Sequence, residues 1–265
     1  MKKIGYVLGI ASLTLVLAAC GNNADKKTDS ENSTKDSYSA KMQNNSSTSK
    51  TNKNQSSTNN PGSANNASSK ADLSNYQYSV PKKDTKKANY VKTGNLAKPR
   101  QFTFDRFGTR QQLTKISQSP KSMTADGMTY KITKVRVVEN SPKTEAAKQA
   151  AAQTLNLQSV PNKYYTFVIN YSVTNNRNSS VALNGINNIK TNRGQTLTTA
   201  SQLSDSSAGN HLTKGQSKAF VSVGYLHDYA TQPTTKVTMN FGAIYDLNGK
   251  QLAAAPNQGL LVSLN

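Results

Sequence analysis

Alternation of apolar and polar residues marks the second half of the chain. The clearest run is 164–175, where the odd positions from 165 to 173 are all apolar. These apolar residues are Tyr165, Phe167, Ile169, Tyr171 and Val173. A period of two predicts a strand that places one face on a core. A second run, 236–246, alternates in the same way and predicts another strand of this kind.

Other segments differ from simple alternation in informative ways. The run 217–226 is apolar on both faces, which is typical of a central strand in a sandwich. The run 128–138 changes the parity of its apolar positions near Thr133, and this change predicts a β-bulge. Further strands are predicted at 113–119, 180–190, 195–199 and 259–264. Turns are predicted at Asn192–Gly194 and at Asn248–Gly249, where Asn-Gly favours a hairpin.

One helix is predicted to interrupt the strands. Ser141 can cap it, Pro142 suits the first helical position, and residues 143–155 are rich in Ala, Gln and Lys. The sequence thus predicts an all-β fold, an antiparallel β-sandwich of seven or eight strands with one inserted short helix. The segment 101–107 alternates weakly, and whether it adds an edge strand stays open.

Three features of this half resemble a known family. They are the strand from Tyr164 that ends in Thr-Asn175-Asn176, Gly194 after a polar strand, and the step Leu212-Thr-Lys-Gly215 before an apolar strand. Residues 113–264 are similar to the immunoglobulin-like domain of many small Gram-positive lipoproteins, which is related in architecture to a secreted mycobacterial antigen fold. The resemblance implies an immunoglobulin-like domain at 113–265 and no shared catalytic residues. The pair of core cysteines and the core Trp of antibody domains are absent.

The N-terminus is typical of a targeting segment. Lys2 and Lys3 precede an apolar run at 4–19, which is shorter than the roughly 20 residues that a membrane-spanning helix needs. The sequence Leu17-Ala-Ala-Cys20 matches the lipobox of bacterial lipoproteins. This resemblance implies a signal peptide at 1–19 and a diacylglyceryl group on Cys20, which would hold the protein on the outer face of a Gram-positive cell membrane. The alternative is an ordinary signal peptide with a chance cysteine.

The segment that follows has a low-complexity composition. Residues 21–70 contain 12 Ser, 11 Asn, 5 Thr and 7 Lys, and across the whole chain only 34% of residues are hydrophobic. Such a segment cannot bury enough apolar surface to offset its ordering entropy. The sequence predicts a disordered tether over residues 20–112, although residues 71–112 carry more aromatic side chains than the rest.

Residues with catalytic or metal-binding chemistry are few. The chain has one Cys, two His and thirteen acidic residues, so we expect no metal site, no cofactor and no enzyme activity. His227 precedes Asp228, which leaves a Ser/His/Asp arrangement conceivable, while His211 lies on a different predicted element. The acids from residue 102 onward are too dispersed to indicate a carboxylate pair, and they are Asp105, Asp126, Glu139, Glu145, Asp205, Asp228 and Asp246.

A formal net charge of +20 is the remaining signal. A basic protein beside a Gram-positive membrane is attracted to phospholipid head groups and to teichoic acids. We expect a non-catalytic binding module whose partners are anionic cell-wall polymers or another envelope protein, and we expect no nucleic acid. One alternative is that the charge serves solubility alone. Another is a cell-envelope enzyme, or an enzyme accessory, with an unrecognised site.

Overall fold

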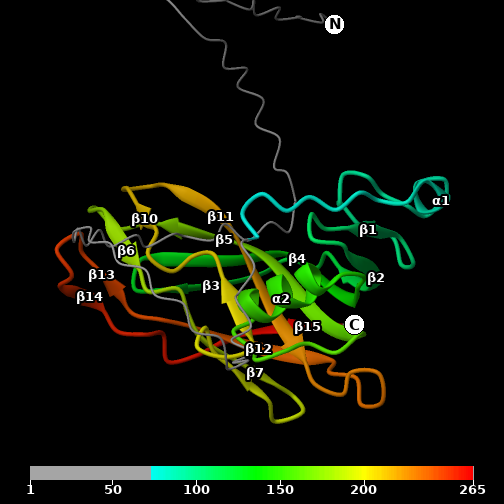
Figure 1. The fold of residues 1–265 in the computed structure, drawn as a ribbon. Coiled ribbons are helices and arrows are strands. Elements are labelled where there is room, and N and C mark those ends of the chain that lie inside the picture. Colours follow the sequence, from blue (N-terminus) through cyan, green and yellow to red (C-terminus); the bar gives the residue numbers. More distant parts are fainter. Residues whose placement is uncertain (1–72, 265) are drawn as a thin grey trace, which may run out of the picture. The chain divides into compact units, whose positions relative to one another are not determined.

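A computed structural model describes residues 73–264, and these form an antiparallel β-sandwich with two short helices (Figure 1). The predicted signal peptide, Cys20 and the first part of the predicted tether, residues 20–72, lie outside the described residues. The helices are α1 (Lys82–Thr85) and α2 (Glu145–Thr154). The strands are β1 (Phe102–Phe104), β2 (Thr109–Ser117), β3 (Lys121–Ala125), β4 (Met128–Pro142), β5 (Tyr164–Asn175), β6 (Val181–Leu183), β7 (Ile186–Thr191), β8 (Thr196–Leu197), β9 (Leu203–Asp205), β10 (His211–Leu212), β11 (Ser217–Leu226), β12 (Lys236–Phe241), β13 (Ile244–Tyr245), β14 (Gln251–Ala253) and β15 (Leu260–Ser263).

The sandwich packs one large sheet against two small ones. The large sheet has the strand order β1-β2-β4-β5-β11-β9, and β3 also pairs with β4. The small sheets have the orders β10-β6-β13-β14 and β15-β12-β7-β8. Their inward side chains form a single core cluster, in which the rings of Tyr130 on β4 and Phe241 on β12 stack at 4.1 Å. The predicted all-β sandwich is therefore confirmed.

The long strands follow the sequence pattern closely. β5 and β11 span the predicted ranges and pair with each other along ten residue pairs, from Ser217 opposite Thr174 to Leu226 opposite Tyr165. Pairing between β4 and β5 shifts register between Ile132 and Lys134, so the bulge predicted near Thr133 is confirmed. Both predicted turns are also present, because Gly194 and Gly249 have positive φ between paired strands.

Two predicted strands are each divided between the small sheets. The predicted strand 236–246 is β12 and β13, and the predicted strand 180–190 is β6 and β7. The breaks fall at Gly242 and at Gly185, which has a φ of 83°. The Gly242 N–H donates to the Gly185 carbonyl at 2.8 Å, so the two breaks lie next to each other in space. These two breaks, together with five short strands outside the predicted ranges (β1, β3, β9, β10 and β14), give fifteen strands in the described residues, so the predicted count of seven or eight is wrong.

The helix begins later than predicted. Thr144, not Ser141, caps α2, because its Oγ1 accepts from the Ala147 N–H at 3.0 Å. Ser141 and Pro142 instead end β4, where they pair with Arg110 and Thr109 of β2. α2 and the loop after it pack on the outer face of the large sheet through a second apolar cluster, whose members include Leu155, Val160, Tyr164 and Tyr225.

The predicted boundary of the tether at residue 112 is wrong, because the fold includes residues 73–112. β1 pairs with β2 at the edge of the large sheet, and β2 begins at Thr109. Leu96 and Phe102 are completely buried, and Leu73 is almost so. The weak alternation of 101–107 does correspond to an edge strand, β1, but Leu73 and Leu96 are isolated apolar residues that give no periodic signal. No helix within residues 73–264 is long and apolar enough to cross a membrane.

Candidate anion-binding site

The structure does not gather the residues that the sequence offered for catalysis. His211 lies on β10, and His227 follows the end of β11; both are exposed. The His227 ring stands edge-on to the ring of Tyr225 at 4.9 Å. Among residues 73–264, no three His, Cys, Asp or Glu side chains lie together in a way that could hold a metal ion. Cys20 lies outside the described residues.

Several of the dispersed acids stabilise turns or bind neighbouring side chains. Asp105 and Asp246 each accept two backbone N–H groups in a β-turn, with N···O distances of 2.8 to 3.0 Å. Glu139 accepts from the Tyr165 hydroxyl at 2.8 Å and lies 3.5 Å from Lys163 Nζ. Burial, followed by this bond to Glu139, raises the pKa of Tyr165 to about 12.

A buried polar cluster links the two layers of the sandwich. The Tyr171 hydroxyl donates to Asp205 at 2.6 Å, and Ser207 Oγ and the Ile186 N–H donate to the same carboxylate at 2.8 Å. Burial is the main reason that the pKa of Tyr171 is well above its usual value. Beside this cluster is a cavity of about 10 Å³, lined by Tyr130, Val173, Leu183, Gly185, Ser207, Phe241, Gly242 and Ile244. This volume is roughly that of one water molecule, so the cavity has no room for a substrate.

Positive charge is concentrated at the start of the fold. Residues 73–112 carry nine basic and two acidic side chains, a net charge of +7 in 40 residues. Residues 113–264 carry 15 basic and six acidic side chains, a net charge of +9 in 152 residues. The first part is therefore about three times as dense in net positive charge. Its exposed cations are Lys82, Lys83, Lys86, Lys87, Lys92, Lys98 and Arg100.

Aromatic side chains hold this part of the chain, here called the basic region (residues 82–112), on the edge of the sheet. Tyr90 makes a bridge to Phe102, with its neighbours Asn89 and Val91 bonded to the Phe102 backbone at 2.9 and 2.8 Å. The rings of Tyr90 and Phe104 lie 5.6 and 6.0 Å from the ring of Phe102. Residues 89–91 thereby cover the free edge of β1, which would otherwise expose unpaired backbone groups.

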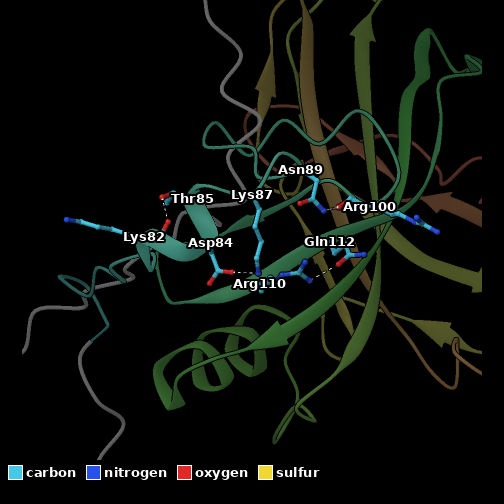
Figure 2. Close-up of polar contacts among 8 residues, drawn as sticks. All are labelled: Lys82, Asp84, Thr85, Lys87, Asn89, Arg100, Arg110 and Gln112. Atoms are coloured by element: carbon cyan, nitrogen blue, oxygen red, sulfur yellow. Dashed lines mark hydrogen bonds and ion pairs between the residues drawn. The ribbon is translucent and has the colours of Figure 1, made fainter.

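Two cations share the ring of Phe102. The Arg110 guanidinium lies 4.1 Å from the ring centroid, and Lys87 Nζ lies 5.8 Å from it. Arg110 Nη1 also donates to Gln112 Oε1 at 2.7 Å, and Lys87 Nζ donates to Asp84 Oδ1 at 2.6 Å. Figure 2 shows Lys87 and Arg110 approaching each other from the loop after α1 and from β2, with Lys82 pointing away from them.

The surroundings of Asp84 favour its charged form. The hydrogen bond from Lys87 is the main cause that lowers the pKa of the Asp84 carboxyl, and the charges of Lys87, Lys83 and Arg110 lower it further. Cations fixed on an aromatic base can bind an anionic group, because a guanidinium offers five N–H donors in a planar fork. The sequence signal that could have located this site was the coincidence of aromatic and basic residues between 76 and 110.

A comparison with models of protein families finds no match for this chain. A comparison with curated proteins finds no match either. The candidate site is therefore argued from its own geometry and charge.

Proposed function

We propose that this chain is a lipid-anchored protein on the outer face of a Gram-positive cell membrane, and that its β-sandwich binds anionic cell-wall polymers without catalysing a reaction. The lipobox at Leu17–Cys20 motivates the membrane anchor. The resemblance of residues 113–264 to the immunoglobulin-like domain of small Gram-positive lipoproteins agrees with this location. The basic region supplies the binding surface.

The observation that carries the binding proposal is the net charge of +7 on residues 73–112. Six lysines and one arginine of this part are exposed, and they lie beside only two acids. Teichoic acids and phospholipid head groups are the anions next to such a protein. Attraction between exposed charges acts over a Debye length, which falls from about 10 Å at 0.1 M salt to about 3 Å at 1 M. Binding through this surface should therefore weaken steeply with salt.

The lipid anchor has a direct test. Replacing the thiol in Cys20→Ala removes the atom that would carry the diacylglyceryl group, so we expect no lipidation and no cleavage before residue 20. Metabolic labelling with a fatty-acid analogue measures this in cells that express the full chain. A single exchange nearby, Asn22→Ala, is the control and should label normally. Equal label in the Cys20 variant would contradict the proposed anchor.

The binding surface is tested with two triple variants of equal charge. Lys82, Lys83 and Lys86 are replaced by Ala in the first, and Lys190, Lys214 and Lys250 in the second; all six lysines are exposed. Retention of residues 21–265 on purified walls, with and without teichoic acid, is measured over a salt series. We expect the first variant to bind roughly 100-fold more weakly at low salt, since each of the three lysines contributes about 1 kcal/mol near an anionic surface.

The second triple variant keeps the basic region and should lose much less affinity. Equal losses in the two variants would show that net charge alone matters, and not this surface. Retention on walls that changes neither with salt concentration nor with removal of teichoic acid would contradict the proposed function and would indicate a protein or glycan partner.

A further inference from the structure

One carboxylate lies inside the basic region, in contact with its cations. Asp84 is on α1, and its Oδ1 accepts from Lys87 Nζ at 2.6 Å. The charges of Lys83 and Arg110 also lower the pKa of this carboxyl, after the larger effect of the hydrogen bond from Lys87. An anion is thus already held where Lys87, from the segment after α1, and Arg110 of β2 converge (Figure 2).

The cations around Asp84 are held in place by the rest of the fold. Phe102 is completely buried, and its ring carries the Arg110 guanidinium at 4.1 Å and Lys87 Nζ at 5.8 Å. The bond from Arg110 to Gln112 Oε1 uses one of the five guanidinium N–H donors. Because the Arg110 guanidinium is held by both contacts before any ligand arrives, an incoming anion loses less entropy in ordering it.

We propose that Lys87 and Arg110 form an anion subsite, which Asp84 occupies in the free protein and which one phosphodiester group of a wall polymer occupies in the complex. This inference rests on the proposed function, and it names the ligand group and an internal competitor for the same surface. A phosphodiester carries the same single charge as the carboxylate, and its oxygens match the planar donor fork of an arginine.

A polymer can compete with Asp84 for the subsite, whereas a single small anion cannot compete well. The Asp84–Lys87 ion pair is partly exposed, with the lysine side chain 53% and the aspartate side chain 14% exposed, and ion pairs near the surface are stabilised only weakly. The intramolecular carboxylate nevertheless has a high effective concentration at the subsite. A polymer that also contacts exposed Lys82, Lys86 and Lys92 gains from several contacts at once and can displace Asp84.

The test compares two single exchanges that remove one negative charge each. Asp84→Asn removes the competitor, whereas Asp126→Asn removes the charge of an exposed acid in the β3–β4 turn, outside the basic region. Residues 21–265 of each variant are titrated with poly(glycerol phosphate) at 0.1 M salt. We expect Asp84→Asn to bind roughly two- to fivefold more tightly, the range that an exposed ion pair spans. The Asp126 variant should change by less than that.

A charge-neutral exchange tests the arginine. Arg110→Lys keeps the charge but loses the planar fork and its stacking on Phe102, so polymer binding should fall severalfold while the salt dependence remains. The Lys87–Asp84 pair stays intact in this variant. Unchanged affinity would show that Arg110 acts only as a point charge and would overturn the subsite.

The outcomes separate this inference from the proposed function. Suppose that the wild-type chain binds the polymer and that exchange of Lys82, Lys83 and Lys86 abolishes this binding. If Asp84→Asn and Asp126→Asn then bind the polymer with equal affinity, the subsite is wrong and the proposed function stands. Weaker binding by Asp84→Asn would mean that Asp84 positions Lys87 for the ligand, which also overturns the competition. If the wild-type chain does not bind, both proposals fail. The same variants are also titrated with phosphatidylglycerol vesicles. If Asp84→Asn binds the vesicles more tightly than the wild type does, but not the polymer, the assignment to a wall polymer is overturned.

Discussion

At the scale of single residues, Asp105 shows how a buried acid can stabilise a turn at a cost. Its Oδ1 accepts from the N–H groups of Phe107 and Thr109 at 3.0 and 2.8 Å, and these bonds close the turn between β1 and β2. Burial raises the pKa of the Asp105 carboxyl above its usual value, and the backbone bonds offset this shift only in part. The turn therefore needs the acceptor atom more than it needs the charge.

Two exchanges at this position separate the acceptor from the charge. Asp105→Ala leaves two N–H groups without their acceptor in a half-buried turn, and we expect a loss of about 1–3 kcal/mol in the free energy of unfolding. Asp105→Asn keeps the acceptor oxygen and removes the buried charge, so it should unfold no more easily than the wild type at pH 7. Chemical denaturation measures both, and equal losses in the two variants would contradict this account.

The raised pKa of Asp105 also predicts that the difference in stability between Asp105→Asn and the wild type depends on pH. A carboxyl whose pKa is raised in the folded state contributes stability that is present below the unfolded pKa of about 3.9 and is lost as pH rises through the folded pKa. The stability of Asp105→Asn relative to the wild type should therefore increase as the pH rises from about 4 toward neutrality. Taking this difference cancels the titration of the other acids. A difference that is constant over this range would contradict the raised pKa.

At the scale of the elements, the paired strands β5 and β11 pack closely where β11 has a glycine. Gly224 of β11 lies opposite Phe167 of β5, and a Cβ built at Gly224 would overlap the Phe167 ring. Phe167 is completely buried in the core. The aromatic ring thus fills the space that a side chain at position 224 would take. Position 224 of β11 therefore has no space for a side chain as long as the Phe167 ring keeps its place.

The exchange Gly224→Ala should force the Phe167 ring out of its place. Overpacking of this kind costs typically about 1–3 kcal/mol, so we expect a clear fall in the midpoint of chemical denaturation. The smaller side chain in Phe167→Leu makes room for the added methyl group. A double-mutant cycle should then show that Gly224→Ala costs less when it is combined with Phe167→Leu than when it is made alone. Additive effects of the two exchanges would contradict direct contact between the positions.

At the scale of the whole molecule, the basic region is part of the fold and not an appendage. Leu113 exchanges backbone bonds of 2.8 Å with Arg100 and Gln101, and residues 109–112 pair with 139–142 of β4. Cutting the chain at residue 113 would remove β1 and part of β2 from the large sheet. It would also expose surface that Leu73, Leu96 and Phe102 cover.

Two shortened chains test this dependence. A chain that starts at residue 73 keeps every described contact, whereas one that starts at 113 loses three buried apolar side chains. Each such side chain contributes about 1.5–3 kcal/mol, so the shorter chain should be less stable by on the order of 5 kcal/mol. Denaturant titration followed by circular dichroism measures the difference. Equal stability would show that residues 73–112 are not part of the cooperative unit.

The sequence by itself determined the class of fold and its central strands. β5 and β11 were predicted to the residue, and the bulge in β4 was predicted from one change in parity. These features depend on local alternation, which a chain records directly because successive side chains of a strand point to opposite faces. The lipobox at Cys20 is likewise a local motif, and it remains a prediction.

The tertiary structure decided what depends on contacts between distant residues. The breaks at Gly185 and Gly242, which divide two predicted strands between sheets, lie where these two distant glycines share a backbone hydrogen bond. The basic region joins the fold through Leu96, an isolated apolar residue, and through Phe102, which lies in a segment that alternates only weakly. The position of Arg110 and Lys87 on one ring arises because β1 pairs with β2 while residues 89–91 return along its edge. No period in the sequence encodes such an arrangement, because it is fixed by packing between segments and not by the pattern within any one of them.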